Sequence, residues 1–161
     1  MINITETLKN IKILAKKKNL IISTAESCTG GLIAKYLTDL PGSSEFYDSS
    51  CITYSNNSKT LLLGVDSKSI ETYGAVSKEV AVEMCNGLLS KNNANLGISV
   101  SGIMGPSSDN TSKSIGLVWS CIKYKDIIEI FQFELNGSRQ ENRETTAKNI
   151  IIKLYDFINE L

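Results

Sequence analysis

Hydrophobic residues recur along this chain in two patterns, one with a helical period and one of short continuous runs. Residues 4–18 carry an apolar side chain at about every third or fourth position, which predicts an amphipathic helix. A short apolar run over residues 20–25 predicts a strand. A periodic segment over residues 29–39 predicts a second helix, which Pro41 ends because proline cannot continue a helix.

The same two patterns continue to the end of the chain. Helix-capping residues and glycines mark most of the boundaries. They predict strands over residues 46–54, 96–101, 115–122 and 127–135, and helices over residues 55–64, 66–73, 77–91 and 139–160. Lys125 and Asp126, between the last two strands, favour a hairpin. The order of elements predicts a single-domain α/β/α sandwich over residues 1–161, with a mixed sheet and helices on its faces.

Composition narrows the classes of function. The chain has 161 residues and equal numbers of basic and acidic side chains, 17 of each, so its formal net charge is zero. A neutral chain has no broad electrostatic surface for nucleic acid or an anionic membrane. The N-terminus has no signal-peptide pattern and no apolar run reaches membrane-spanning length, so a cytoplasmic protein is expected.

The absence of histidine removes several kinds of active site. Without imidazole there is no Ser-His-Asp or Cys-His catalysis and no histidine-ligated metal site. The cysteines Cys28, Cys51, Cys85 and Cys121 form no CxxC pair, so their spacing supports neither zinc nor a disulfide framework. We therefore expect no metal and no cofactor. Any general base must be a lysine, a carboxylate, a tyrosine or the terminal amine.

Residues 23–31 (STAESCTGG) form the stretch most suited to chemistry. A strand leads into small polar residues and a glycine pair, and a helix follows them. A corner of this kind presents a side chain at the end of a strand and points backbone N–H groups of the next helix at one place. Ser27 is the candidate nucleophile, with an oxyanion site beside it. The alternative is that this serine is a plain helix N-cap.

Lys59 is the best candidate for the base of such a serine. Burial lowers the pKa of a lysine towards neutrality, and Lys59 sits just before the apolar run 61–63. Tyr54, a few residues earlier, is a candidate for relaying a proton or holding the serine oxygen. The alternative interpretation of Lys59 is an ordinary solvated helix lysine.

Other residues of the same corner are candidates for contact with the substrate. Glu26 orients a substrate amide or the lysine, or it stabilises the start of the next helix. Cys28 is either a second nucleophile or a packing residue that contributes its backbone N–H, and we favour packing. Thr29 and Gly30 complete this polar segment and are expected to contact the substrate.

Glycine-rich and polar segments later in the chain also follow strands, where α/β sheets place their ligands. Gly102 and Gly105 let the backbone approach a ligand closely, or they simply make a turn. Arg139 opens the last helix beside backbone amides and suits a phosphate or carboxylate group. Its alternative is a surface ion pair with Glu141 or Glu144.

Several motifs occur together in a fixed order. They are Glu26-Ser27-Cys28-Thr29-Gly30-Gly31, Leu40-Pro41-Gly42-Ser43-Ser44, Thr53-Tyr54-Ser55-Asn56 followed by Lys59, Leu63-Gly64-Val65, Gly74-Ala75-Val76-Ser77, Ser101-Gly102-Ile103 with Gly105-Pro106, and Gly116-x-Val118-Trp119. The set resembles the CinA C-terminal domain family over about residues 5–158. The chain is similar to the stand-alone form of that family, whose enzymatic members are nicotinamide-nucleotide amidases.

The resemblance implies hydrolysis of the carboxamide of nicotinamide mononucleotide (NMN) in pyridine nucleotide recycling. The products are nicotinate mononucleotide and ammonia. The resemblance also implies Ser27 as nucleophile, Lys59 as base, Tyr54 as their partner and Arg139 as a residue of the site. It implies no metal. A homodimer is expected from the resemblance and from the general frequency of twofold oligomers.

One loop departs from the family's usual pattern. Met104 stands in place of an alanine, Ser108 and Asp109 in place of a glycine pair, and Ser114 in place of a proline. We expect the polar residues 107–114 to form an exposed, mobile loop, and a nucleotide contact there would change substrate choice. Two other functions stay open: a family member that binds nucleotide without hydrolysing it, as a regulatory module, and an amidase for another small amide.

Overall fold

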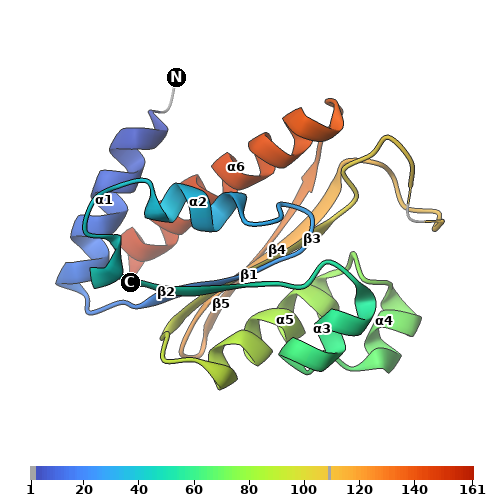
Figure 1. The fold of residues 1–161 in the computed structure, drawn as a ribbon, viewed down its shortest axis with the longest axis horizontal. Coiled ribbons are helices and arrows are strands. Elements are labelled where there is room, and N and C mark those ends of the chain that lie inside the picture. Colours follow the sequence, from blue (N-terminus) through green and yellow to red (C-terminus); the bar gives the residue numbers. More distant parts are fainter. Residues whose placement is uncertain (1–2, 109) are drawn as a thin grey trace.

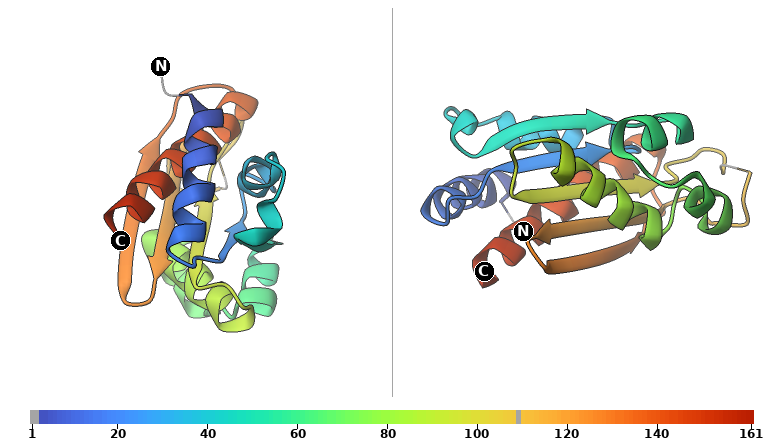
Figure 2. Two further views of the ribbon diagram at one scale, coloured as in Figure 1. Left: turned by 90° about the vertical axis from the view of Figure 1, so that its left-hand side faces the viewer. Right: turned by 90° about the horizontal axis from the view of Figure 1, so that it is seen from below.

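A five-stranded sheet lies between two layers of helices in the computed structural model, which describes residues 3–108 and 110–161 (Figure 1). The helices are α1 (Ile4–Lys17), α2 (Leu32–Thr38), α3 (Asn56–Leu63), α4 (Ser67–Tyr73), α5 (Lys78–Lys91) and α6 (Arg139–Glu160), with a 3₁₀ turn at Ser43–Glu45. The strands are β1 (Ile22–Glu26), β2 (Tyr47–Ile52), β3 (Leu96–Gly102), β4 (Leu117–Tyr124) and β5 (Ile127–Glu134). The predicted α/β sandwich is confirmed: α1, α2 and α6 cover one face of the sheet, and α3, α4 and α5 cover the other (Figure 2).

The strands run in the order β2-β1-β3-β4-β5 across the sheet. β2, β1 and β3 are parallel, with Ala25 opposite Cys51 on one side and Ser99 on the other. β4 and β5 are antiparallel and pair from Tyr124 opposite Ile127, so the predicted mixed sheet and hairpin are confirmed. Because the carboxyl ends of the three parallel strands meet at one edge, the segments that follow β1, β2 and β3 lie together there.

Capping side chains set the starts of several helices where the sequence predicts them. Ser55 caps α3 and Ser138 caps α6, each in a reciprocal capping box with the side chain three residues later. Ser77 caps α5. These local signals place Lys59 one turn into α3 and Arg139 at the first position of α6.

Two boundaries next to the candidate nucleophile differ from the sequence prediction. β1 begins at Ile22 rather than residue 20, and α2 begins only at Leu32. The residues between them form turns in which Gly30 and Gly31 have φ of +59° and +99°. Glycine reaches these left-handed angles without a steric penalty, so the glycine pair extends the corner before the helix starts.

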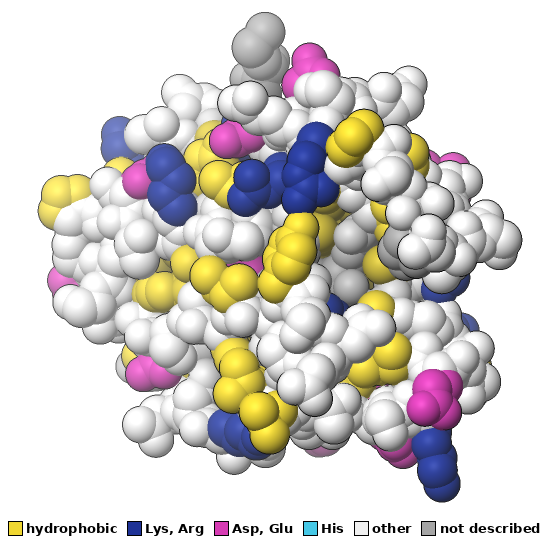
Figure 3. All heavy atoms as spheres, turned by 45° about the vertical axis from the view of Figure 1, so that its right-hand side comes forward, with side chains coloured by type: hydrophobic (Ala, Val, Ile, Leu, Met, Phe, Trp, Pro, Cys, Tyr) yellow, Lys and Arg dark blue, Asp and Glu magenta, His cyan; other side chains and the backbone are white. Residues whose placement is uncertain are grey.

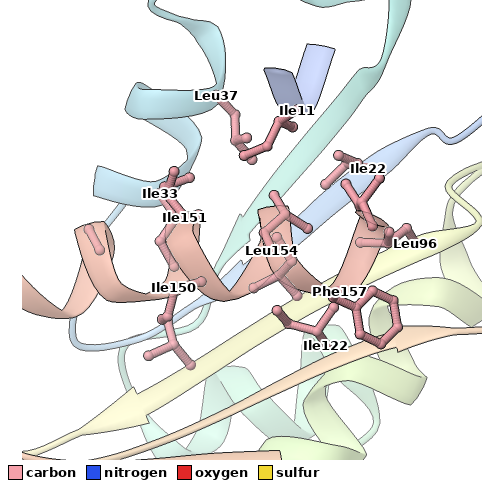
Figure 4. Close-up of a cluster of buried hydrophobic side chains, with 14 of the residues drawn as sticks. Ile11, Ile22, Ile33, Leu37, Leu96, Ile122, Ile150, Ile151, Leu154 and Phe157 are labelled. Carbon is pink, nitrogen blue, oxygen red and sulfur yellow. The ribbon is translucent and has the colours of Figure 1, made fainter. Parts of the chain in front are cut away.

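The main hydrophobic core lies between the sheet and the layer of α1, α2 and α6 (Figure 4). Its buried members include Ile11, Ile22, Ile33, Leu37, Leu96, Ile122, Ile150, Ile151, Leu154 and Phe157. Most of the α6 contribution comes after residue 146, at the spacing of one buried helix face. The core therefore fixes the C-terminal half of α6, which leaves its first turns to contact the loops at the sheet edge.

Residues 3–108 and 110–161 contain neither a membrane-spanning helix nor a cluster of metal ligands. No helix in these ranges is long and apolar enough to cross a lipid bilayer. Nor do three or more His, Cys, Asp or Glu side chains of these ranges gather as metal ligands would.

Candidate active site

Ser27 and Lys59 meet at the edge of the sheet where β1 ends. Ser27 is the first residue after β1, and its main-chain N–H donates to Val100 O at 3.1 Å, which holds it beside β3. Lys59 donates from Nζ to Ser27 Oγ at 3.0 Å. The same Nζ donates to Thr53 O at 2.8 Å. A serine hydroxyl within hydrogen-bond reach of a lysine amine is the geometry of an activated nucleophile.

Burial prepares Lys59 to act as a base. The residue is 1% exposed, so the alternative of a solvated helix lysine is wrong. Removal from water disfavours the ammonium form and lowers the pKa of Lys59 from 10.5 to about 8. In the described part of the chain Lys59 forms no salt bridge that would retain its charge. About a tenth of the amine is then neutral at pH 7, with a lone pair that can accept the Ser27 proton.

Glu26, not Ser27, caps the helix that follows the turn. Its fully buried carboxylate accepts bonds from the N–H groups of Gly31 and Ala34 at 2.9 and 2.8 Å. It also accepts a bond of 2.6 Å from the Thr29 hydroxyl. The plain N-cap interpretation of Ser27 is therefore wrong, and the alternative role of Glu26 at the start of the helix is confirmed.

Cys28 packs directly beside the nucleophile. Its thiol is buried, and loss of hydration raises the pKa of Cys28 to about 12, so packing fits better than a thiolate nucleophile. Apart from the sulfur of its own side chain, the main-chain N–H of Cys28 has no hydrogen-bond acceptor among the described residues. A free N–H next to the attacking oxygen is the donor that an oxyanion requires.

A cavity of about 360 Å³ opens in front of Ser27 and Lys59, on the hollowed face seen in Figure 3. Besides the residues already named, its walls include Ile70, Val76, Ser101, Met104, Ser108 and Thr111. Lys59 and Arg139 are the cations of its described lining, and no described lining residue is acidic. Hydrophobic side chains lie around the hollow, and basic side chains gather along one side of this face (Figure 3). The cavity therefore suits a small ligand with an apolar part and a negative charge.

The expected substrate contacts divide into two groups. Four of these residues line the cavity: Cys28, Gly102, Gly105 and Arg139. Three lie outside its lining: Glu26, Thr29 and Gly30. These three shape the turn behind Ser27, which gives them a supporting role in place of the expected substrate contact. Gly102 has to be small, because a Cβ there would lie 2.8 Å from Val118 Cγ2.

Arg139 and Tyr54 bridge two walls of the cavity. The Arg139 guanidinium donates to Gly105 O at 2.8 Å and to the Tyr54 hydroxyl at 2.7 Å. Tyr54 is 61% exposed at the mouth of the cavity. Lys59 contacts Ser27 directly, so the structure needs no tyrosine between base and nucleophile.

Neither acidic neighbour of Arg139 on α6 pairs with it. Glu141 accepts bonds from Ser138 in the capping box, and Glu144 accepts a bond of 2.7 Å from the Tyr36 hydroxyl. The alternative of a surface ion pair is therefore wrong. No described carboxylate pairs with the guanidinium at the cavity, which leaves it available to bind an anion.

Two residues that sequence reasoning missed hold the loops of the site in place. Asn142 is buried and donates from Nδ2 to Met104 O at 3.2 Å. Arg143 donates from Nε to Cys28 O at 3.2 Å and from Nη2 to Thr29 O at 2.9 Å. Both lie one helical turn after the first residue of α6 and share its face. This spacing is the signal that could have found them.

The loop between β3 and β4 begins with buried residues 103–105 and is mostly exposed over residues 106–108 and 110–115, as expected, and one side chain ties it across the cavity. Lys113 donates from Nζ to Tyr73 O at 2.5 Å and to Val76 O at 2.6 Å. This tether restrains a loop that the sequence predicts to be mobile. Ser108, one of the departures from the family pattern, lines the cavity. Asp109 lies outside the described residues, as do Met1 and Ile2.

The sequence is similar to known proteins over most of its length. The sequence profile of the CinA C-terminal domain matches residues 4–158. A CinA-like protein from Fusobacterium nucleatum is 41% identical over 144 residues, which are 89% of this chain and 35% of the relative. A CinA-like protein from Syntrophomonas wolfei is 42% identical over 130 residues, which are 81% of this chain and 31% of the relative. The chain therefore spans about a third of the length of these curated relatives.

Solved structures agree in fold over nearly the whole chain. A CinA superfamily protein from Klebsiella pneumoniae has a TM-score of 0.95 at 25% identity, covering 99% of this chain and 100% of that one. The competence/damage inducible protein CihA from Agrobacterium tumefaciens has a TM-score of 0.91 at 35% identity, covering 97% and 95%. The profile match and the shared architecture lead to one conclusion: this chain belongs to the CinA family.

Proposed function

We propose that this chain is an amidohydrolase that converts NMN to nicotinate mononucleotide and ammonia. The observation that carries the proposal is the contact of 3.0 Å between the Ser27 hydroxyl and the buried Lys59 amine. This pair supplies a nucleophile and a base in a chain without histidine. The family resemblance supplies the substrate.

The first half of the reaction forms an ester on Ser27. Neutral Lys59 accepts the Ser27 proton on its lone pair, while one amine hydrogen keeps the bond to Thr53 O. Ser27 Oγ attacks the carboxamide carbon, and the π electrons of the carbonyl move onto its oxygen. The Cys28 N–H donates to this oxyanion, a contribution of about 3 kcal/mol.

The second half releases both products. The Lys59 ammonium gives its proton to the departing nitrogen, so the C–N bond breaks and ammonia leaves. Neutral Lys59 then takes a proton from water, whose oxygen attacks the ester carbon. Ser27 Oγ leaves, takes the proton back from Lys59 and restores the starting state. The proposed cycle uses no metal and no cofactor.

The cavity offers partners for the phosphate and for the pyridinium ring of the nucleotide. Arg139 supplies the positive charge that a phosphate requires, with the Tyr54 hydroxyl beside it. Ile70, Val76 and Met104 supply apolar surface for the flat pyridinium ring. The positive charge of that ring also favours the neutral form of nearby lysines, which the base needs.

Ammonia release from NMN tests the proposal. Ser27→Ala should lower kcat by at least about 10³-fold, because it removes the nucleophile. Ser90→Ala, at an exposed position of α5, is the matched control and should leave kcat unchanged. Undiminished turnover in Ser27→Ala would exclude Ser27 as the nucleophile.

The same assay separates the two alternatives. A nucleotide-binding module would bind NMN in a calorimeter and release no ammonia. An amidase for another small amide would prefer nicotinamide or nicotinamide riboside to NMN. We expect Arg139→Met to raise the KM for NMN and to leave that for the riboside unchanged, because only NMN carries phosphate. A cytoplasmic homodimer belongs to the same proposal, and light scattering in solution tests the oligomeric state.

A further inference from the structure

The turn that follows Ser27 connects the guanidinium of Arg143, a half-buried residue of α6, to the Cys28 N–H, the proposed oxyanion donor. We infer that Arg143 is a positioning residue. Through two hydrogen-bonded peptide units it orients the Cys28 N–H and, by polarising those units, makes that N–H a stronger hydrogen-bond donor. The inference rests on the proposed function, because it concerns the oxyanion formed on attack by Ser27. Its basis is an unbroken series of hydrogen bonds from the guanidinium to that N–H.

The series has two bonds and ends at a free donor. Arg143 Nη2 donates to Thr29 O at 2.9 Å. The N–H of Gly30 belongs to the same peptide unit as Thr29 O, and it donates to Ser27 O at 3.1 Å. The N–H of Cys28 belongs to the same peptide unit as Ser27 O and, apart from its own thiol, has no acceptor within residues 3–108 and 110–161. Each peptide unit thus accepts on one side and donates on the other.

Trans peptide geometry fixes the direction of the free donor. The C=O and N–H of a trans unit point in opposite directions, so an anchored carbonyl aims its N–H away from the anchor. Arg143 Nε also donates to Cys28 O at 3.2 Å, which orients the N–H of Thr29 in the same way. One planar guanidinium therefore holds two consecutive carbonyls, a task for which a lysine ammonium lacks the fixed pair of donors.

The charge of Arg143 acts on the backbone because no carboxylate takes it up. Arg143 forms no salt bridge with any residue that the structure describes. Successive hydrogen bonds polarise one another, and a charged donor at the start of the series strengthens the effect. Arg143 lies outside the cavity lining, so it polarises the Cys28 N–H without placing a further cation beside the substrate.

Gly30 has the size and the backbone angle that this contact needs. A Cβ at position 30 would lie 3.1 Å from Arg143 Nη2. The φ of Gly30 is +59°, a conformation that glycine adopts freely. The turn is therefore built to admit the guanidinium to the Thr29 carbonyl.

Kinetics of Arg143 variants with NMN test the inference. Oxyanion stabilisation acts in the transition state, so Arg143→Ala should lower kcat about 10- to 100-fold and change KM by less than about twofold. Arg143→Lys keeps the positive charge but lacks the fixed pair of N–H donors, and it should give an intermediate kcat. Millimolar guanidinium ion should restore part of the kcat of Arg143→Ala. Lys148→Met, which removes an exposed charge from the same helix, should behave as wild type.

A second reaction separates this inference from the proposed function. Acylation of Ser27 by p-nitrophenyl acetate, followed by mass spectrometry of the Ser27 peptide, also passes through an oxyanion. If wild type is acylated but releases no ammonia from NMN, the proposed function fails and the acylation rates decide the inference. Those rates should fall in the order wild type, Arg143→Lys, Arg143→Ala.

Three results would overturn the inference. The first is a wild-type kcat or acylation rate in Arg143→Ala, and the second is a loss that lies in KM alone. The third is a wild-type chain that neither hydrolyses NMN nor is acylated at Ser27. If Arg143→Ala fails to fold by thermal melting, Arg143→Lys decides, and a rate equal to wild type then counts against the inference.

Discussion

The two faces of the sheet bury hydrophobic clusters of different size, and among the described residues only one face buries a lysine. The face beneath α1, α2 and α6 carries one large hydrophobic cluster, to which Ile98 and Leu154 belong. The face beneath α3, α4 and α5 carries two small hydrophobic clusters together with buried hydroxyls and Lys59. The contrast is direct on β3, where the neighbour of Ile98, Ser99, donates to Ala81 O of α5 at 2.5 Å.

One face of the sheet therefore contributes mainly to stability, and the other contributes the proposed base. The large cluster supplies most of the hydrophobic stabilisation and holds α6 in place. The face beneath α3, α4 and α5, the polar layer, buries the Lys59 amine. This burial is unfavourable while the amine is charged, but it gives the amine the lowered pKa that a base needs. The site lies at the sheet edge, where Lys59 comes from the polar layer and Arg139, Asn142 and Arg143 come from the other.

The largest expected effect is a loss of activity without a loss of stability. Lys59→Met replaces a buried amine with an apolar side chain of similar length, so kcat for ammonia release should fall at least about 10³-fold. The free energy of unfolding at pH 7 should stay equal or rise, because no charged amine is buried any longer. Steady-state kinetics and thermal melting measure the two quantities.

Lys68→Met, at an exposed position of α4, is the control for that substitution. It should change neither kcat nor the melting temperature. A melting temperature well below wild type in Lys59→Met would mean that the amine supports the fold. The division between the two faces would then be too simple.

Truncation of one core side chain on each face compares the layers directly. Leu154→Ala should lower the free energy of unfolding by about 3 kcal/mol, because it opens a cavity in the large cluster. Ser99→Ala should lower it by about 1 kcal/mol, since it removes one hydrogen bond. Urea denaturation measures both. Equal losses would contradict the assignment of stability to the α1, α2 and α6 face.

The pH dependence of activity tests whether Lys59, buried in the polar layer, acts as a base. Lys59 acts in its neutral form, so kcat/KM should rise about tenfold per pH unit below its pKa of about 8 and level off above it. The folded state binds fewer protons at Lys59 than the unfolded state between about 8 and 10.5. Stability from this group therefore rises with pH across that window. A kcat/KM that falls through pH 8 would contradict a lysine base.

The smallest expected effect concerns the loop tether across the cavity. Lys113→Met removes the bonds to Tyr73 O and Val76 O, so KM should rise about two- to fivefold while kcat changes little. Lys9→Met, at an exposed position of α1, should alter neither. A large loss of kcat in Lys113→Met would place the loop in the chemistry rather than in substrate retention.

Local signals were enough to predict most of the fold. Capping residues and periodicity mark α3, α5 and α6 because each acts within a few residues of chain. The Ser27–Lys59 pair followed from the missing histidine together with the spaced motifs, and the structure brings the two side chains together. Here the restricted set of possible bases and the family resemblance together made a distant contact predictable.

The features that the sequence left open or did not predict depend on backbone groups that it does not distinguish. Glu26 binds N–H groups of Gly31 and Ala34, whose positions depend on the turn before α2. Arg143 binds two carbonyl oxygens that lie more than a hundred residues away along the chain. Every residue has a carbonyl, so no letter of the sequence marks those of Cys28 and Thr29 as partners.

The anchorage of the site loops to α6 has a consequence for how the protein can vary. Asn142 and Arg139 bind the main-chain oxygens of Met104 and Gly105, so these contacts do not depend on which side chain stands at the anchored position. Met104, which is buried in the main hydrophobic cluster, can therefore be exchanged for another apolar side chain while the loop stays in register with the nucleophile. Such a scaffold allows the cavity wall to change without moving the main chain that faces Ser27.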